Sequence, residues 1–363
     1  MRIGTYYFLQ KPPGRAPEDV IAEEVDQMVL SETLGFDSVW LTEHHYADYG
    51  LSSAPTALLA TLAARTQRVR LGMAVYVLPF HHPLRLAEET ATLDILSGGR
   101  LTVGLGRGNR PIEFLGHGVR QDESRTRLEE GVEVLLQAWT RERVTFHGRH
   151  WQIDNVPVYP KPITRPHPPF AFAVGSPDSL RWAGSQGYAI MSSGLFTPLA
   201  AALRNREIYL EALTAAGHPA EIRDSLLERW VYTKHVYVAE TDAQARADAE
   251  GPERWFLDSY ARSISPEGLN GLSEAVRQQA AAAVERVRNL RWEQLVEDSL
   301  LIGSPATLRA RIAELQAVGV GELLCWMNFG GIPPDKVRRS MRLFANDVLP
   351  EFSPSPRIVH HAR

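Results

Sequence analysis

The stretch VRLGMAVYVLPFHHPLRLAEETATLDILSGGRLTVGLGRG, residues 69–108, decides the fold. It opens with an apolar run that is typical of a buried strand. After Pro83, apolar residues recur at helical spacing, and a second apolar run follows the glycine pair at 98–99. A strand, a helix and a strand in this order form a unit whose strands are parallel.

Similar units fill the chain on both sides of this stretch. Four strand–helix steps fit within about the first 110 residues, and the alternation resumes near residue 170. The total is roughly eight units, the number in a TIM barrel. We therefore predict an α/β fold of the (β/α)8 type that forms a single domain over residues 1–363.

Two insertions account for the length beyond the ~250 residues typical of that barrel. Residues 144–168 are rich in proline and turn residues, which predicts a hairpin or a cover segment. Residues 251–300 contain a helical pattern and follow the seventh predicted strand. We expect the insertions at the C-terminal face of the barrel, where the second is either a lid or a solvated surface helix.

Composition narrows the classes of partner. The chain has 39 Lys and Arg against 43 Asp and Glu, a formal net charge of −4, and its basic residues are scattered among acidic ones. This distribution predicts no nucleic-acid partner. Cys325 is the only cysteine, so an internal disulfide is excluded, and no segment approaches the ~20 apolar residues of a membrane span. We expect a cytoplasmic protein without a membrane partner.

Adjacent histidines in LTEHHYADYG, residues 41–50, follow a predicted strand. Side chains alternate across a strand, so His44 shares a side with Trp40 and Thr42, opposite Leu41. The outer side must be apolar to meet helices, which places His44 inward at the catalytic rim. A buried core histidine is the alternative interpretation. Zinc needs several converging ligands, whereas adjacent histidines on a strand diverge, so we predict no metal site.

The glycine-rich run GLGRGNRPIEF, residues 104–114, does not match a dinucleotide-binding fingerprint, because Asn109 stands where the third glycine is needed. The run leaves Arg107 between glycines at the end of a predicted strand. A guanidinium group suits a phosphate, and glycines allow close approach of the backbone. The alternative is a structural turn with an exposed arginine.

A second anion site is indicated by AVGSPDSLRW, residues 173–182, where a strand ends at Gly175 and a helix starts at Pro177. Backbone N–H groups and the hydroxyls of Ser176 and Ser179 would face a bound anion there. Taken alone, Ser176 is better explained as a helix N-cap. Two such strand ends in one barrel favour a phosphorylated ligand.

Three stretches carry a resemblance to a known family. They are GFDSVWLTEHHYADYGL (35–51), VLPFHHPLRLAEETATLDILSGGRLTVGLGRG (77–108) and SMRLFANDVLPEF (340–352). In order and spacing they resemble the α subunit of bacterial luciferase. The chain is similar, nearly end to end, to the luciferase-like flavin-dependent monooxygenases.

The resemblance implies a site for reduced FMN at the C-terminal rim. His44 would face the reactive edge of the flavin as the catalytic residue, and a cis peptide bond between Ala74 and Val75 would lie behind the ring. The other implied cofactor-binding residues, grouped around the phosphate, are Arg107, Val174, Gly175, Ser176 and Ser179.

The chain departs from the luciferase α pattern at two glycines. Gly106 stands where that subunit has a reactive cysteine, and Gly175 where it has a glutamate. The neighbourhood at Asn109, Arg110 and Pro111 also differs. These changes leave flavin chemistry intact and weaken the case for light emission.

The implied activity is that of an FMN-dependent monooxygenase, which oxygenates an apolar organic substrate with O2 through a flavin C4a-peroxide. Attack on an aldehyde or ketone carbonyl and hydroxylation both remain open. His44, with an ordinary pKa near ~6.5, would be the general acid and base. Glu43 or His45 would orient it, although strand alternation argues against direct contact. Aromatic side chains that either line the substrate chamber or belong to the core are Tyr6, Phe8, Trp40, Tyr76, Trp230, Tyr232 and Trp326.

Partners follow from the same resemblance. The chain has no nicotinamide fingerprint, so we expect a separate flavin reductase and a two-component system. A homodimer through helices of the first half of the barrel is implied. Three other functions remain: a deazaflavin-dependent oxidoreductase of the same superfamily, a non-catalytic subunit resembling luciferase β, and a metal-dependent barrel hydrolase.

Overall fold

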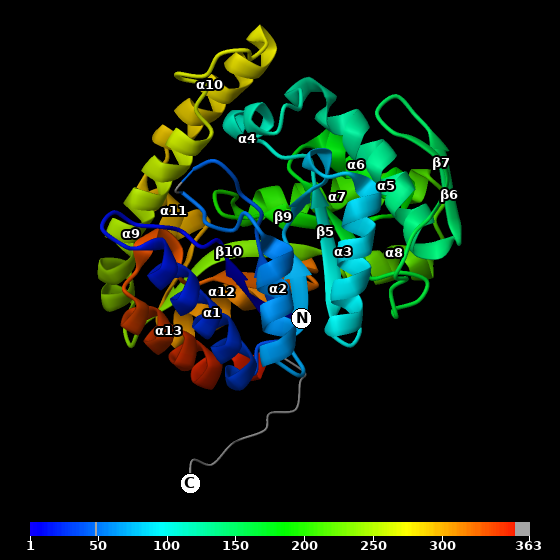
Figure 1. Ribbon diagram of the computed structural model, residues 1–363. Coiled ribbons are helices and arrows are strands. Elements are labelled where there is room, and N and C mark those ends of the chain that lie inside the picture. Colours follow the sequence, from blue (N-terminus) through cyan, green and yellow to red (C-terminus); the bar gives the residue numbers. More distant parts are fainter. Residues whose placement is uncertain (48, 353–363) are drawn as a thin grey trace.

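A barrel of parallel strands forms the centre of the molecule (Figure 1). The computed structural model describes residues 1–47 and 49–352, so residues 48 and 353–363, with the end of the predicted domain, lie outside the described part. The barrel strands are β1 (Arg2–Tyr7), β2 (Ser38–Leu41), β3 (Arg70–Met73), β5 (Leu101–Gly106), β8 (Phe170–Val174), β9 (Ala189–Ser193), β10 (Val231–Val238) and β12 (Glu322–Trp326). Within the described part these eight strands form a closed ring, because β12 pairs with both β1 and β10. The predicted (β/α)8 fold is confirmed.

A helix follows each barrel strand and packs on the outside of the ring. In order these helices are α1 (Pro17–Leu34), α2 (Pro55–Arg65), α3 (Pro83–Leu96), α5 (Ser124–Thr140), α6 (Pro177–Gln186), α7 (Leu199–Ala215), α12 (Pro305–Val318) and α13 (Pro334–Asp347). Proline begins most of them, because its fixed φ suits the first helical turn and its missing N–H has no partner there. In residues 1–47 and 49–352, no helix is long and apolar enough to cross a membrane.

The N-terminal end of the barrel interior is filled by a hydrogen-bonded carboxylate. Glu322 of β12 is buried, accepts a hydrogen bond from Trp40 Nε1 at 3.0 Å and forms an ion pair with Arg2 at 3.0 Å. Ser38 also donates to Glu322. The interior is therefore a packed core at this end, and the opposite, C-terminal rim is where a barrel of this kind carries its site.

The second predicted insertion leaves the C-terminal end of β10, the seventh barrel strand, as expected. It consists of α9 (Asp242–Ser263), α10 (Glu274–Arg288), α11 (Trp292–Asp298) and the short strand β11 (Leu301–Gly303). It begins earlier than predicted, because α9 runs without interruption through residue 251. In Figure 1, α10 projects beyond the barrel, whereas α9 lies across its rim.

The first insertion requires a correction. Strands β6 (Arg143–His147) and β7 (Gln152–Pro157) form the predicted hairpin. The hairpin follows α5 and precedes β8, so it is attached at the N-terminal end of the barrel and not at the C-terminal face. Its turn runs back along α5, where the N–H groups of Arg149 and His150 donate to Glu130 at 2.8 Å.

The remaining elements are β4 (Tyr76–Val77), α4 (Pro111–Gly116), α8 (Ala220–Leu227) and the 3-10 turns η1 (Leu78–Phe80), η2 (Gln121–Glu123), η3 (Phe329–Gly331) and η4 (Leu349–Glu351).

A buried polar pair fastens α9 to the barrel. His235 of β10 and Glu253 of α9 form a 2.7 Å hydrogen bond between Nδ1 and Oε2, and neither side chain is exposed. The His235 ring also stacks on Phe329 at 4.3 Å between ring centres. Because both groups would be left without a partner if α9 moved away, this pair holds the helix against the rim.

We expect Glu253→Ala to destabilise the protein by about 1–3 kcal/mol, because it leaves His235 buried without its hydrogen-bond partner. Equilibrium unfolding in guanidinium chloride measures the change. The control is Glu250→Ala on the same helix, which breaks an exposed ion pair with Arg254 and should leave the midpoint nearly unchanged. Equal midpoints for the two variants would show that the buried pair does not stabilise α9.

Candidate active site

The carboxylate of Glu43, just after β2, is the common acceptor for three groups at the rim. It is buried and accepts hydrogen bonds at 2.8 Å from His45 Nε2, from His81 Nε2 and from the backbone N–H of Val77. Burial raises the pKa of Glu43, but the hydrogen bonds from the two histidines outweigh it and lower the pKa to about 2. The same contact raises the pKa of His81 above its ordinary value, against the opposing effect of burial.

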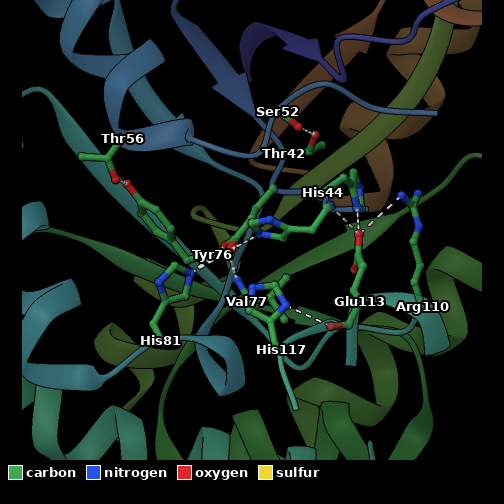
Figure 2. A network of polar contacts seen from close by, with 12 residues as sticks. Thr42, His44, Ser52, Thr56, Tyr76, Val77, His81, Arg110, Glu113 and His117 are labelled. Carbon is green, nitrogen blue, oxygen red and sulfur yellow. Dashed lines mark hydrogen bonds and ion pairs between the residues drawn. The ribbon is translucent and has the colours of Figure 1, made fainter. Parts of the chain in front are cut away.

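His44 has a different partner from the ones predicted. Its Nδ1 lies 2.9 Å from Oε1 of Glu113, a buried residue of α4, and Glu113 also accepts the His45 N–H at 3.1 Å. The prediction that Glu43 or His45 orients His44 is wrong, since those two residues bond to each other. In Figure 2, Glu113 stands between His44 and Arg110, whose Nη1 is 3.7 Å from the same carboxylate oxygen.

The charge state of His44 also differs from the expectation. Burial lowers its pKa, the charge of Arg110 lowers it further, and Glu113 offsets only part of this, so the pKa is about 4 instead of near 6.5. Burial raises the pKa of Glu113, but His44 and Arg110 together bring it below its ordinary value. At neutral pH the neutral His44 ring therefore donates Nδ1–H to an ionised carboxylate and keeps a lone pair on Nε2. The ring stacks on Phe8 at 4.3 Å.

The peptide bond between Ala74 and Val75 is cis, as predicted. The Ala74 N–H donates to the carbonyl of Leu41 at 2.7 Å, which ties this bend to the strand that carries the histidines. On the other side, a side chain at Gly104 would collide with the Met73 carbonyl, and one at Gly106 would collide with Val75. These glycines therefore make room for the third strand and not for a phosphate, and Val75 fills the space that a thiol at position 106 would need.

The residues predicted to surround a phosphate lie together. Arg107, Val174, Ser176 and Ser179 line one pocket, whose other walls are Arg125, Leu128, Glu129, Ala173 and Trp182. Gly175 is next to it and donates its N–H to Ser179 Oγ at 3.2 Å. A Cβ at Gly106 would lie 3.6 Å from that of Ala173, a wall of the pocket, and would also collide with Val75, so both residues border Gly106.

The start of α6 and a second arginine shape this pocket. Ser176 and Ser179 form a reciprocal capping box, so their hydroxyls are already engaged by the helix end, as in the N-cap interpretation. Burial lowers the pKa of Arg107, and the charge of Arg125 lowers it further. Two adjacent cations at a helix N-terminus favour an anion with more than one negative oxygen.

The aromatic candidates divide into two groups. Tyr6 and Phe8 pack on Trp326, with ring centres 5.3 and 4.9 Å away, beside His44. The rest are core residues with hydrogen bonds of their own or buried among other side chains. They are Trp40, Tyr76, Trp230 and Tyr232.

Sequence reasoning missed several site residues: Glu113, Arg110, Arg125 and His81. Glu113 belongs to α4 and Arg110 directly precedes this helix, whose start is marked by Pro111 shortly after the glycine-rich strand end. That signal would have placed a short helix at the rim, with Arg110 and Glu113 three residues apart on one face. No local pattern pairs Arg125 or His81 with its neighbours in the site.

Residues 1–322 match a family model described as luciferase-like monooxygenase. The chain belongs to the luciferase-like monooxygenase family. It is 25% identical over 368 residues to the oxygenase component of the flavin-dependent trigonelline monooxygenase of Acinetobacter baylyi, covering 100% of this chain and 98% of that protein.

Solved structures of similar proteins agree with this assignment. The monooxygenase RslO1 from Streptomyces bottropensis has a TM-score of 0.79 at 29% identity, covering 97% of this chain and 100% of that one. The oxygenating constituent of 3,6-diketocamphane monooxygenase from Pseudomonas putida, solved in complex with FMN, has a TM-score of 0.79 at 24% identity, covering 97% and 98%. The second likeness concerns the fold.

In this luciferase-like chain we expect Glu43→Gln to reduce stability in a pH-dependent way. The lowered pKa of Glu43 stabilises the fold above pH ~4.5, and this is lost as the pH falls toward the folded pKa of about 2. The raised pKa of His81 stabilises the folded protein below pH ~6.5, and this stabilisation is lost as the pH rises through the pKa of His81 in the folded protein. The free energy of unfolding of the wild type should therefore exceed that of the variant most between about pH 5 and 6.5, by roughly 2–3 kcal/mol.

Urea unfolding from pH 2 to 9 tests this, with Glu285→Gln on the exposed surface of α10 as the control. A constant difference between wild type and Glu43→Gln across that range would contradict the assigned ionisation of Glu43.

Proposed function

We propose that this chain is the oxygenase half of a two-component system, which uses externally supplied reduced FMN and O2 to oxygenate an apolar organic substrate. One observation carries the proposal: the C-terminal ends of neighbouring strands carry a doubly cationic pocket, a carboxylate-bound neutral histidine and a cis peptide bond. Family membership supports it, as does the description of one relative as an oxygenase component.

The rim residues fit the chemistry of FMN. Arg107 and Arg125, beside the start of α6, would hold the phosphate, and Ala74 and Val75 would lie against the ring. Val174, Gly175, Ser176 and Ser179 would shape the phosphate end. Bound reduced FMN supplies the electrons that activate O2.

His44 would manage one proton during the reaction. Glu113 fixes the ring through Nδ1, which leaves Nε2 of a neutral imidazole to accept a proton. A low pKa suits a group that must not protonate the reacting centre too early. Phe8 and Trp326 pack beside the ring and exclude water from that side.

The proposal includes two protein partners and a cytoplasmic setting. A separate flavin reductase would supply the cofactor, because the chain lacks a nicotinamide fingerprint. A second copy would cover the face formed by α2 and α3, which leaves Ile95 and Leu96 exposed.

We expect bound reduced FMN to return to its oxidised absorbance more slowly than free reduced FMN after rapid mixing with aerated buffer. His44→Ala should speed this return at least about tenfold, because proton control at the site is lost. The control is His82→Ala, since His82 is exposed and packs on Trp151 away from Glu113. Oxidation at the rate of free FMN in all three proteins would oppose the monooxygenase proposal and favour a deazaflavin enzyme or a non-catalytic subunit.

Arg107→Met should weaken binding of reduced FMN by about tenfold or more, because a charge-assisted contact to the phosphate is removed. Riboflavin lacks the phosphate, so its affinity should not change. Anaerobic titration followed by flavin absorbance measures both, with Arg85→Met on the exposed face of α3 as the control. A parallel loss of riboflavin and FMN affinity would place the phosphate elsewhere.

A further inference from the structure

Arg110 is a buried cation with an incomplete set of partners. It precedes α4, its side chain is 3% exposed, and its Nε is buried without a hydrogen-bond partner among the described residues. Its closest charge is Glu113, 3.7 Å from Nη1, which is beyond hydrogen-bond distance. The guanidinium carbon lies 5.2 Å from the ring centre of Phe8 and 4.6 Å from that of Tyr49. Aromatic faces attract this charge, but they satisfy none of its five N–H donors.

The free edge of Arg110 faces away from its ion-pair partner. Nε and Nη2 share one edge of a guanidinium group, and Nη1 occupies the other side. Glu113 is nearest to Nη1, whereas Nε is buried and has no partner in the part of the chain that is described. The open edge is therefore the two-donor fork that matches a planar carboxylate.

Glu113 cannot accept a hydrogen bond from Arg110 in its present position. Its Oε1 already accepts from His44 and from the His45 N–H. Movement toward Arg110 would break the contact that orients the His44 ring. The geometry therefore keeps Glu113 for the histidine and leaves the arginine fork to another acceptor.

Tyr49 offers a second, independent donor at the same place. Its ring lies against the guanidinium of Arg110, its side chain is 5% exposed, and its hydroxyl is buried without a hydrogen-bond partner among the described residues. A buried hydroxyl normally has a partner, so two unpartnered donors on touching side chains indicate a missing acceptor.

The surroundings indicate the rest of the ligand. Phe8 packs between Tyr49 and Trp326, and Tyr49 also borders Phe256 and Tyr260 of α9, with ring centres 6.3 and 6.4 Å away. These rings provide apolar contact area directly beside the donors. A molecule that satisfied both would have an anionic oxygen pair at one end and an apolar or aromatic body.

We propose that Arg110 and Tyr49 bind the carboxylate of the substrate, and that the substrate is consequently an apolar organic acid. This rests on the proposed function, which provides the oxygenation of an apolar molecule at this rim. The same groups would also donate to a flavin carbonyl oxygen, and the experiment separates the two acceptors.

The test uses benzoate and benzamide, which are close in shape and differ in charge. Binding of each to the protein saturated with reduced FMN is measured by anaerobic calorimetry. We expect the wild type to prefer benzoate by about tenfold or more, and Arg110→Met to lose this preference without change in benzamide affinity. Arg110→Lys keeps the charge without the fork and should retain only part of the preference.

Tyr49→Phe keeps the ring and removes only the hydroxyl. It should weaken benzoate binding about threefold or more and leave benzamide unaffected. This variant keeps the proposal testable if Arg110→Met does not fold, which its thermal unfolding curve will show.

Three results would overturn the assignment: no preference in the wild type, an unchanged preference in Arg110→Met and Tyr49→Phe, or a loss of FMN affinity in Arg110→Met that matches its loss of benzoate affinity. The last result would assign the fork to the flavin. The titration of wild type with reduced FMN alone is read separately, and its failure would reject the proposed function itself.

Discussion

Hydrogen bonding between β1 and β12, strands about 320 residues apart in the chain, closes the barrel, and the site depends on this closure. Parallel strands in a closed ring all end at one rim, so His44 after β2, Arg107 after β5 and Trp326 at the end of β12 are brought together. The opposite end is filled by Glu322 and its partners. Closure therefore brings the strand ends that carry the candidate site to one rim.

Two buried carboxylates divide the rim into parts with different charge. Glu43 binds His45 and His81, and its very low pKa reflects that these contacts outweigh burial. Glu113 binds His44, whose pKa is also low, because burial and then the charge of Arg110 beside it disfavour a positive charge on the ring. The neighbouring histidines 44 and 45 therefore have different partners: His45 bonds to Glu43, whereas His44 bonds to Glu113 and is neutral at neutral pH.

The sequence allowed prediction of the repeated strand–helix units and of the residues at the ends of strands. The alternation of strand and helix patterns was sufficient to predict the barrel. The predicted strand ends also drew attention to His44, Arg107 and Ser176, which lie at the C-terminal rim. Glu113 is 69 residues from His44 on a six-residue helix, and its contact follows from how that helix packs. Side chains alternate between two faces only within a strand, and β2 ends at Leu41. Alternation therefore could not predict the partners of the histidines that follow.

On the proposed assignment, the departure at Arg110 would link substrate binding to the protonation of His44. After burial, the charge of Arg110 is the largest cause of the low pKa of His44. An anion on the open edge of Arg110 would compensate that charge and raise the pKa of His44 toward its ordinary range. The histidine would then become protonatable only when an organic acid is in place. A neutral substrate could fill the same aromatic surroundings without producing this change, so charge would decide which bound molecule is competent to react.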